Sequence, residues 1–255
     1  MADKVDDIVV VLTACVNPAA HSQLRRSDAQ LRMKDYLDAL TFWLTLDDIR
    51  ISGIVLLENS GYDGEAFQSL LSRDNRHSRV FEYISIVPAP IPPGVHYGWA
   101  EFKMLDEGIE RSQLCRNARF LLKATGRYTF PNVTAYLDAL PPLVEVSVHC
   151  RNYKLPWTMR IVAVGCGFFL TTPDRYRRHF RGAWQDMSPT LTVIEFALWR
   201  RLMPFKGQPW ISLRFSELIR VCGHGGTGDD LDTFGKRLKW SLRRFLGKVA
   251  PWWWI

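Results

Sequence analysis

The stretch Ile8-Val-Val-Val-Leu12, followed by Thr13-Ala-Cys-Val-Asn-Pro18, decides the fold of this chain. Five consecutive β-branched and aliphatic residues that run into a polar segment with proline are typical of a buried strand followed by a loop. We therefore expect a first strand near the amino terminus, with Thr13 in the loop at its carboxyl end.

Strand and helix patterns alternate from this point through residue 130. Helical spacing of apolar residues covers 31–46, 65–71 and 97–112, and strand-like runs cover 51–57, 80–87 and 119–123. This order predicts an α/β fold with a mostly parallel central sheet and helices on both faces. Ligands in such sheets bind beyond the carboxyl ends of the strands, so the loops 13–18, 58–61 and 124–128 are the expected site loops.

The second half of the chain is less regular. Strands are expected at 144–150, 160–164, 165–170 and 211–215, and helices at 173–180, 191–202 and 233–249. The glycine run 223–228 predicts a loop, either a lid over a ligand or a linker. We expect one domain over 1–232, with halves 1–130 and 131–232, and a separate basic helix and tail over 233–255.

The composition excludes several classes of protein. The chain has 255 residues, 47% hydrophobic and 23% charged, which is typical of a soluble globular protein. No apolar run reaches the ~18 residues of a membrane-spanning helix, and the acidic amino terminus differs from a secretory signal. The five cysteines form no CxxC pair and the six histidines no HExxH motif, so neither a disulfide framework nor a metal site is expected.

Charge is distributed unevenly along the chain. Residues 1–110 hold 10 Lys or Arg and 17 Asp or Glu, a net of −7, whereas residues 111–255 hold 23 and 9, a net of +14. Such asymmetry suggests a polyanionic partner for the second half: nucleic acid, an anionic membrane or a nucleotide diphosphate. A solvated basic surface without a specific partner would give the same pattern.

The segment Lys123-Ala-Thr-Gly-Arg-Tyr128 is the most informative motif, because it closes a strand where an α/β site lies. It offers a cation, the Thr125 hydroxyl, a glycine that permits close backbone approach, and an arginine whose planar fork suits phosphate. The alternative is a basic corner at the surface.

Three motifs carry a family resemblance. The sequences ENSG at 58–61, the GxxYGxxE-like helix start at 94–101 and K-x-TGRY-xx-N at 123–132 resemble bacterial capsular and lipopolysaccharide proteins of the GT-A nucleotide-sugar glycosyltransferase type. The resemblance implies a GT-A-like (Rossmann-like) fold, with a nucleotide-sugar-binding half over 1–130 and an acceptor half over 131–232. It also implies these donor-binding residues: Thr13, Glu58, Asn59 and Ser60 for the nucleoside, Glu101 on the helix, Lys123, Arg127 and Arg160 for the diphosphate, and Thr125, Gly126 and Tyr128 at the sugar.

The chain departs from this family at its metal motif, because Thr125-Gly-Arg-Tyr128 stands where the DxD sequence is expected. Fixed cations can stabilise a leaving diphosphate through the same electrostatics as a metal ion. We therefore expect Arg127 to act in catalysis without a metal or another cofactor. The alternative is that Glu58 and Glu101 converge to bind a metal.

Glu195 is the predicted general base. It lies in the apolar helical segment 191–202, where desolvation raises the pKa of a carboxyl group toward a useful value. Asp186 is the reserve candidate. In the alternative interpretation Glu195 points outward or pairs with Arg200 or Arg201.

The carboxyl-terminal segment predicts an amphipathic helix. Phe234, Leu238, Leu242, Phe245, Leu246 and Val249 fall on one stripe, Lys and Arg on the other side, and tryptophans follow at 252–254. This pattern is typical of a helix at a membrane interface. We therefore expect a cytoplasmic protein that is peripheral on the inner membrane face. The alternative is a helix packed on the domain.

Taken together, the sequence predicts a glycosyltransferase that moves a sugar from a nucleotide-sugar to a surface polysaccharide or lipid-linked glycan, with no nucleic-acid partner. The first rival is a nucleic-acid-binding protein, which the pI of about 9.3 would suit. The second rival is a scaffold of the same fold without catalysis.

Overall fold

The computed structural model describes residues 6–18, 25–152, 162–190 and 193–250. The strands are β1 (Ile8–Ala14), β2 (Ile51–Glu58), β3 (Val80–Ser85), β4 (Phe120–Thr125), β5 (Tyr128–Thr129), β6 (Val146–Ser147), β7 (Cys150–Asn152), β8 (Val162–Val164), β9 (Phe168–Thr171), β10 (Ile211–Ser212) and β11 (Cys222–Gly223). The α-helices are α1 (Ala29–Thr45), α2 (Glu65–Asp74), α3 (Gly98–Arg111), α4 (Gln113–Asn117), α5 (Val133–Asp138), α6 (Pro173–Arg175), α7 (Ile194–Leu202) and α8 (Phe234–Val249). A π-helical turn (Tyr176–Phe180) follows α6, and short 3-10 helices cover Ala183–Asp186 and Met203–Phe205.

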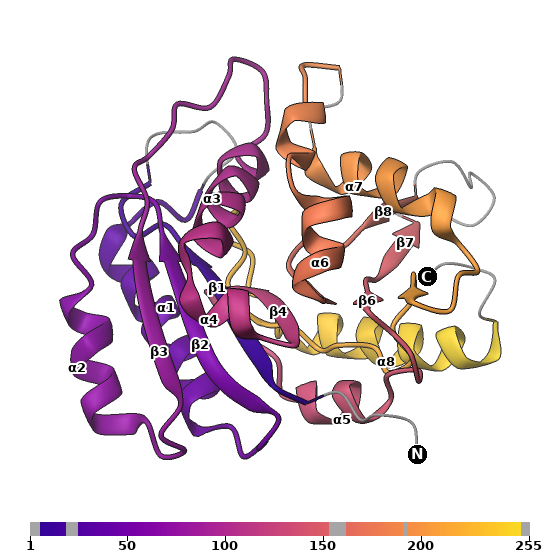
Figure 1. Ribbon diagram of the computed structural model, residues 1–255, viewed down its shortest axis with the longest axis horizontal. Helices are drawn as coiled ribbons and strands as arrows, with labels where there is room; N and C mark the ends of the chain where they lie inside the picture. Colours follow the sequence, from indigo (N-terminus) through magenta and orange to yellow (C-terminus); the bar gives the residue numbers. More distant parts are fainter. Residues whose placement is uncertain (1–5, 19–24, 153–161, 191–192, 251–255) are drawn as a thin grey trace.

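The central sheet has the strand order β10-β6-β9-β4-β1-β2-β3 (Figure 1). Strand β1 runs parallel to β2 and β4, β2 parallel to β3, and β6 parallel to β10. Strand β9 is antiparallel to β4 and β6. The prediction of a mostly parallel sheet is confirmed.

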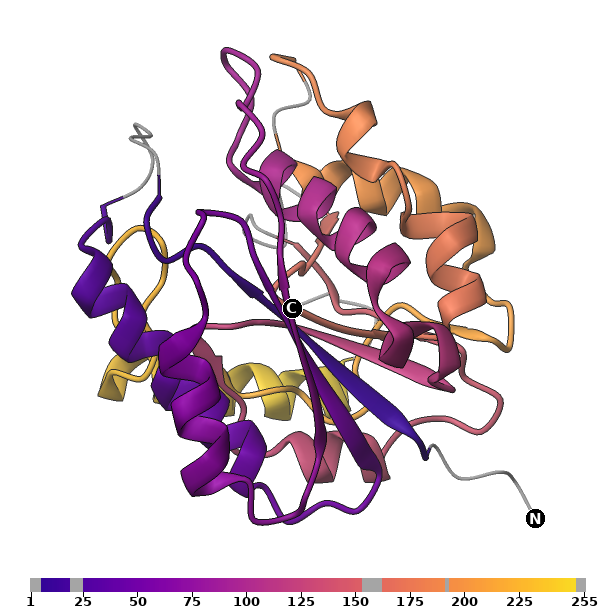
Figure 2. The ribbon, with the colours of Figure 1, turned by 60° about the vertical axis from the view of Figure 1, so that its left-hand side comes forward.

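Helices cover both faces of this sheet (Figure 2). Ile8, Val10 and Leu12 of β1 pack with α1, α2 and α5, whereas Val9 and Val11 pack with α3 and α7. All of β1 is buried because its alternate side chains enter two different cores. The expected α/β class with helices on both faces is therefore confirmed.

The parallel register brings the expected site loops to one edge of the sheet. Thr13 lies opposite Leu57 of β2 and Thr125 of β4. The chain then turns so tightly that the Gly126 N–H donates to the Thr13 carbonyl at 3.0 Å. A Cβ at Gly126 would lie 2.8 Å from that oxygen, so the motif requires glycine there.

The second half differs more from expectation. The strand predicted at 144–150 divides into β6, in the central sheet, and the start of β7, in a separate pair with β8. Part of the predicted glycine loop is β11, which pairs with β5 so that Gly223 lies opposite Tyr128. Residues 160–161 and 191–192 of two other predicted elements lie outside the described residues, and helices α4 and α5 were not predicted.

The predicted carboxyl-terminal helix is confirmed as α8, which runs along the lower side of the molecule in Figure 1. None of the described helices has the length and hydropathy needed to cross a membrane. The proposed division of the chain at residues 130 and 232 stays a prediction.

Candidate active site

Two cavities meet at the carboxyl edge of the sheet. The first, of about 470 Å³, is lined by Thr13, Asn59 and Ser60 and by the proline-rich loop 88–91. The second, of about 530 Å³, lies among α7, α8 and the segment before β9. The two cavities share four of their lining residues, which are Tyr97, Glu101, Thr125 and Arg127. These four residues form the junction between the cavities, and a ligand in each would meet its neighbour there.

Glu101 of α3 is held at the junction by hydrogen bonds. Its Oε1 accepts from Lys123 Nζ at 2.6 Å and from Thr13 Oγ1 at 2.8 Å. Burial by itself would raise the pKa of this carboxyl, but the Lys123 ammonium, these hydrogen bonds and Arg127 outweigh it and lower the pKa. Glu101 is therefore a fixed anion at neutral pH.

Lys123 occupies a different place from the one expected of a diphosphate ligand. Only 1% of it is exposed. Its ammonium donates to Glu101 Oε1, to the Cys166 carbonyl at 2.8 Å and to Thr125 Oγ1 at 3.3 Å. An ammonium has three N–H donors, and all three are engaged, so Lys123 as folded compensates Glu101 instead of facing a ligand.

Arg127 is the cation that faces both cavities. It is 8% exposed, and one guanidinium N–H donates to the His224 carbonyl at 2.7 Å. Its Nε is buried and has no hydrogen-bond partner among the described residues. Burial opposes the charge, yet Tyr36, Tyr128 and Glu101 raise its pKa, so the guanidinium stays charged. A buried donor without a partner is costly, and an anionic ligand at the junction would satisfy it.

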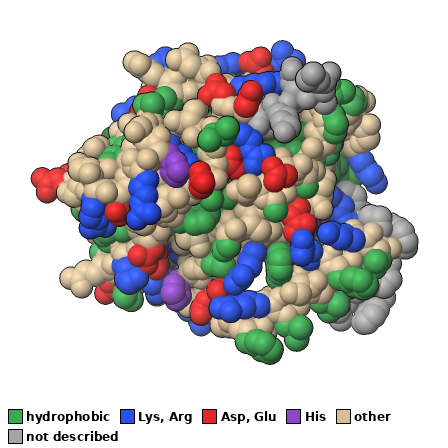
Figure 3. Space-filling model, turned by 90° about the horizontal axis from the view of Figure 1, so that it is seen from below, with side chains coloured by type: hydrophobic (Ala, Val, Ile, Leu, Met, Phe, Trp, Pro, Cys, Tyr) green, Lys and Arg blue, Asp and Glu red, His purple; other side chains and the backbone are tan. Residues whose placement is uncertain are grey.

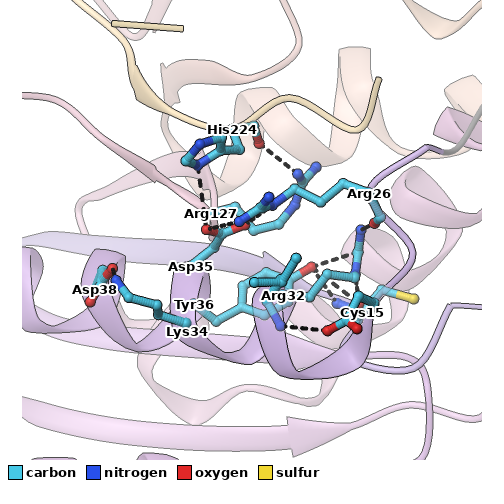
Figure 4. A network of polar contacts seen from close by, with 11 residues as sticks. Cys15, Arg26, Arg32, Lys34, Asp35, Tyr36, Asp38, Arg127 and His224 are labelled. Carbon is cyan, nitrogen blue, oxygen red and sulfur yellow. Dashed lines mark hydrogen bonds and ion pairs between the residues drawn. The ribbon is translucent and has the colours of Figure 1, made fainter. Parts of the chain in front are cut away.

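A network that the sequence did not predict surrounds Arg127 (Figure 4). Arg32 of α1 donates to the Cys15 carbonyl at 2.7 Å and to the Tyr36 hydroxyl at 2.8 Å, which fixes the loop after β1. Arg26 forms a two-bond ion pair with Asp35 on the same side. The one signal in the sequence that could have indicated this network is Arg32, a charged residue within the predicted helix 31–46.

The acidic residue of the ENSG motif organises its loop. Glu58 is fully buried, and it accepts hydrogen bonds from the amides of Val16, Ser60 and Tyr62 and from the Ser60 hydroxyl. Both carboxylate oxygens of Glu58 are therefore engaged within its own loop and the loop after β1. Glu58 lines neither of the two cavities, whereas the sequence predicted that it contacts the nucleoside. The neighbouring Asn59 lines the first cavity, and its buried Oδ1 has no partner among the described residues.

Glu195 lies in the first turn of α7 and lines the second cavity. Its Oε2 is buried without a hydrogen-bond partner in the described structure. Burial raises the pKa of this carboxyl, with a further contribution from Glu101. Arg201, its possible partner in the alternative interpretation, pairs with Asp186 instead. The reserve base, Asp186, lines neither described cavity.

Of the remaining predicted site residues, three lie within the described residues and one does not. Thr125 and Tyr128 line the second cavity, and Gly126, directly after β4, donates its N–H to the carbonyl of Thr13 in β1. Arg160 lies outside the described residues. Within the described ranges, no group of three or more His, Cys, Asp or Glu could hold a metal ion, and Glu58 and Glu101 bind different partners.

No protein-family model and no curated protein matches the sequence. Solved structures to which the chain is similar include the galactosyltransferase LgtC in complex with donor and acceptor sugar analogues, at 13% identity over 80% of this chain and 73% of that chain, with a TM-score of 0.49. They also include 4-diphosphocytidyl-2C-methyl-D-erythritol synthase from Anaerococcus prevotii, at 11% identity over 93% and 95% of the two chains, with a TM-score of 0.48. A putative nucleotide-diphospho-sugar transferase from Desulfovibrio desulfuricans has 6% identity over 81% and 80%, with a TM-score of 0.46. With TM-scores below 0.5, none of them assigns the chain to a family or an activity.

Proposed function

We propose that this protein transfers a sugar from a nucleotide-sugar to a glycan acceptor. One observation carries the proposal. Two cavities meet where Arg127 presents a buried guanidinium N–H, the second cavity contains a buried carboxylate oxygen of Glu195, and neither atom has a hydrogen-bond partner among the described residues. A fixed cation and a basic carboxylate in adjoining cavities suit the transfer of a group from an anionic leaving group to a hydroxyl.

The donor would occupy the first cavity. Its wall combines apolar side chains from the loop 88–91 with the polar groups of Asn59 and Ser60, a combination that suits a nucleoside. The diphosphate would then extend to Arg127 at the junction. Lys123 and Thr13 would act indirectly, since they hold Glu101 in place.

The chemistry would use two residues of this chain directly. The bond from the sugar carbon to the diphosphate oxygen breaks, and Arg127 stabilises the negative charge that develops on that oxygen. The acceptor hydroxyl forms the new bond to the sugar carbon, and Glu195 takes its proton. The raised pKa of Glu195 makes it a stronger base than an exposed carboxylate. We propose that transfer needs no metal ion.

The proposed acceptor is a surface polysaccharide or a lipid-linked glycan, reached by a protein that lies on the cytoplasmic side of the inner membrane. Helix α8 supports this part of the proposal. Its apolar stripe is exposed to solvent at Phe234, Leu238, Leu242, Phe245 and Val249, in a helix that also carries many cations. An exposed apolar stripe on a cationic helix suits the interface of an anionic bilayer.

Thermal-shift measurements with nucleoside diphosphates and their sugars test the proposal, because a ligand that binds only the folded state raises the melting temperature. We expect a shift with one base and none with the free sugars. Turnover of that donor should persist in EDTA. Absence of any nucleotide-dependent shift would contradict glycosyl transfer, and loss of turnover in EDTA that Mn²⁺ restores would contradict metal independence alone. Binding without turnover on any glycan would favour the scaffold interpretation.

A further inference from the structure

We propose that the second cavity binds a phosphate group carried by the acceptor, and that this acceptor is anchored in the bilayer on which α8 lies. The inference rests on the proposed function and specifies the substrate class of its acceptor site. It combines two independent observations: the charge of the cavity wall and the orientation of α8.

The wall of the second cavity has a large excess of positive charge. Besides Arg127, it contains six cations, whereas its acids are Glu101, Glu195 and Asp232; the six are Arg151, Arg220, Lys236, Arg237, Lys239 and Arg243. Asp232 is shared between Arg220 and Arg237. Glu101 is already compensated by Lys123. Arg127, Lys236 and Lys239 are therefore left without an acidic ion-pair partner among the described residues.

Two lysines of α8 supply part of that charge. Lys236 Nζ donates to the carbonyl of Asp230 at 2.7 Å, which leaves two of its three N–H donors available. Neither Lys236 nor Lys239 forms an ion pair within the described part of the chain. An anionic phosphate group, with several acceptor oxygens on one atom, is the compact ligand that such a group of donors suits.

Helix α8 has its cationic side toward the cavity and its apolar stripe toward solvent. Trp240 Nε1 donates to the Ile219 carbonyl at 3.1 Å, and Arg244 pairs with Glu217 of the body at 2.5 Å. Lys236, Trp240 and Arg243 follow at helical spacing and line the cavity, whereas Leu238, Leu242 and Phe245 are more than half exposed. Figure 3, which views the molecule from below, shows hydrophobic side chains at the lower margin and Lys and Arg side chains beside a hollow.

This orientation places the cationic cavity next to a surface that suits a bilayer. If the apolar stripe enters the membrane interface, the opposite side of the same helix lies at the depth of the lipid phosphates. A phosphate that links a glycan to a lipid tail would then reach the cavity while its tail stays in the bilayer. Glu195, in the same cavity, would face the sugar hydroxyls next to that phosphate.

Binding of three probes to the full-length protein tests the inference: dodecyl phosphate below its micellar concentration, inorganic phosphate, and the uncharged dodecyl maltoside. We expect dodecyl phosphate to bind most tightly, inorganic phosphate more weakly at the same site, and dodecyl maltoside not to compete. The double variant Lys236→Glu/Lys239→Glu should weaken binding of dodecyl phosphate about tenfold or more, since it removes two charged donors and introduces two negative charges.

The control is Arg76→Glu/Arg116→Glu, which makes the same change in net charge at exposed residues that line neither cavity. Equal effects of the two double variants would overturn the inference, because only the overall field would then matter. Equal affinity for dodecyl phosphate and dodecyl maltoside would also overturn it, as would tight, salt-sensitive binding of single-stranded RNA that displaces dodecyl phosphate. Nucleoside diphosphate binding, followed separately in each variant, reports on the donor cavity, so a failure of the proposed function itself would appear there.

Discussion

At the scale of single residues, hydrogen bonding gives the two cations of the K-x-TGRY motif different roles. Lys123 is enclosed and has its three donors engaged by Glu101, Thr125 and Cys166. Arg127 keeps a buried donor without a partner in the described structure. Two residues of similar charge, four positions apart, therefore have different roles: one fixes an anion and the other is available to a ligand.

Replacement of Arg127 by Gln should lower turnover by about 10²–10³-fold, because a preorganised donor to the developing charge is lost. Arg127→Lys should recover part of the rate, since it restores the charge without the planar fork. Steady-state kinetics and nucleoside diphosphate affinity measure both effects. Arg76→Gln is the control, because it makes the same substitution at an exposed arginine that lines neither cavity. Wild-type turnover in Arg127→Gln would remove Arg127 from the mechanism.

Replacement of Glu195 by Gln should lower turnover by about 10²–10⁴-fold, as expected for loss of a general base. The acidic limb of the wild-type rate profile should lie above the ordinary carboxyl pKa of 4.5, because burial raises the pKa of Glu195 and only the deprotonated form is active. Donor affinity should barely change. A Gln variant with near-normal turnover would place the base elsewhere or indicate transfer with retention of configuration.

The same substitution should stabilise the protein at neutral pH. A carboxyl whose pKa is raised on folding favours the folded state below its unfolded pKa, and this contribution is lost as the pH rises through the folded pKa. Wild-type Glu195 therefore opposes folding once it is deprotonated, because burial disfavours its charged form. Melting temperatures of wild type and Glu195→Gln should differ at pH 7 and converge below about pH 4. A less stable Gln variant at neutral pH would mean that the carboxylate has a partner in solution.

At the scale of secondary-structure elements, α8 is an amphipathic helix with the unusual property that no residue of it is buried. Its contacts with the body include a hydrogen bond from Trp240 and an ion pair of Arg244, and its apolar stripe is exposed at Phe234, Leu238, Leu242, Phe245 and Val249. A helix held in this way contributes little to the core, so its sequence is free to serve a surface outside the molecule.

The triple variant Leu238→Ser/Leu242→Ser/Phe245→Ser should lose binding to anionic liposomes and keep its stability. These side chains are more than half exposed, and surface substitutions usually change the free energy of unfolding by less than about 0.5 kcal/mol each. Liposome sedimentation and urea unfolding measure the two quantities. Ile49→Ser/Val87→Ser/Leu143→Ser removes three apolar side chains elsewhere that are even more exposed, and this variant should bind as wild type does. A triple α8 variant that unfolds would instead place the stripe in a core.

At the scale of the whole molecule, the charge asymmetry of the sequence has a structural counterpart. The acidic first half builds most of the parallel sheet, and the basic second half supplies α7, α8 and most of the second cavity. Positive charge therefore gathers around the second cavity, whereas the first cavity has only Arg32 and Arg127 as cations in its described wall.

Salt should separate the two binding functions. Between about 0.1 M and about 1 M salt the Debye length falls from about 10 Å to about 3 Å, so exposed cations lose their long-range attraction to anionic lipid. Buried Arg127 is screened much less. We expect liposome binding to weaken strongly with salt while nucleoside diphosphate affinity changes little. If salt weakened liposome binding and nucleoside diphosphate affinity to the same extent, the nucleotide would bind at the exposed basic surface.

Much of the architecture was predictable because its signals are local. The apolar run 8–12 indicates a strand and the helical spacing of 31–46 indicates a helix, each from a short stretch of neighbouring residues. The parallel order of the strands then predicts a site at their carboxyl ends, which is where the candidate site lies. Two-residue strands such as β5, β6 and β11 carry no such signal. Their existence depends on partners far along the chain, which is why the strand predicted at 144–150 divides between two sheets.

The sequence by itself determined the alternation of strands and helices in the first half, the sheet edge at which the candidate site lies and the two faces of α8. Only the tertiary structure decided which cation stays available and which face of α8 is covered. The physical reason is the same in both cases: a side chain's role depends on its desolvation and on its partners. Lys123 meets Glu101 from α3 and Cys166 from a distant loop, and α8 meets the carbonyl of Ile219, so contacts across the fold select among states that the local sequence permits equally.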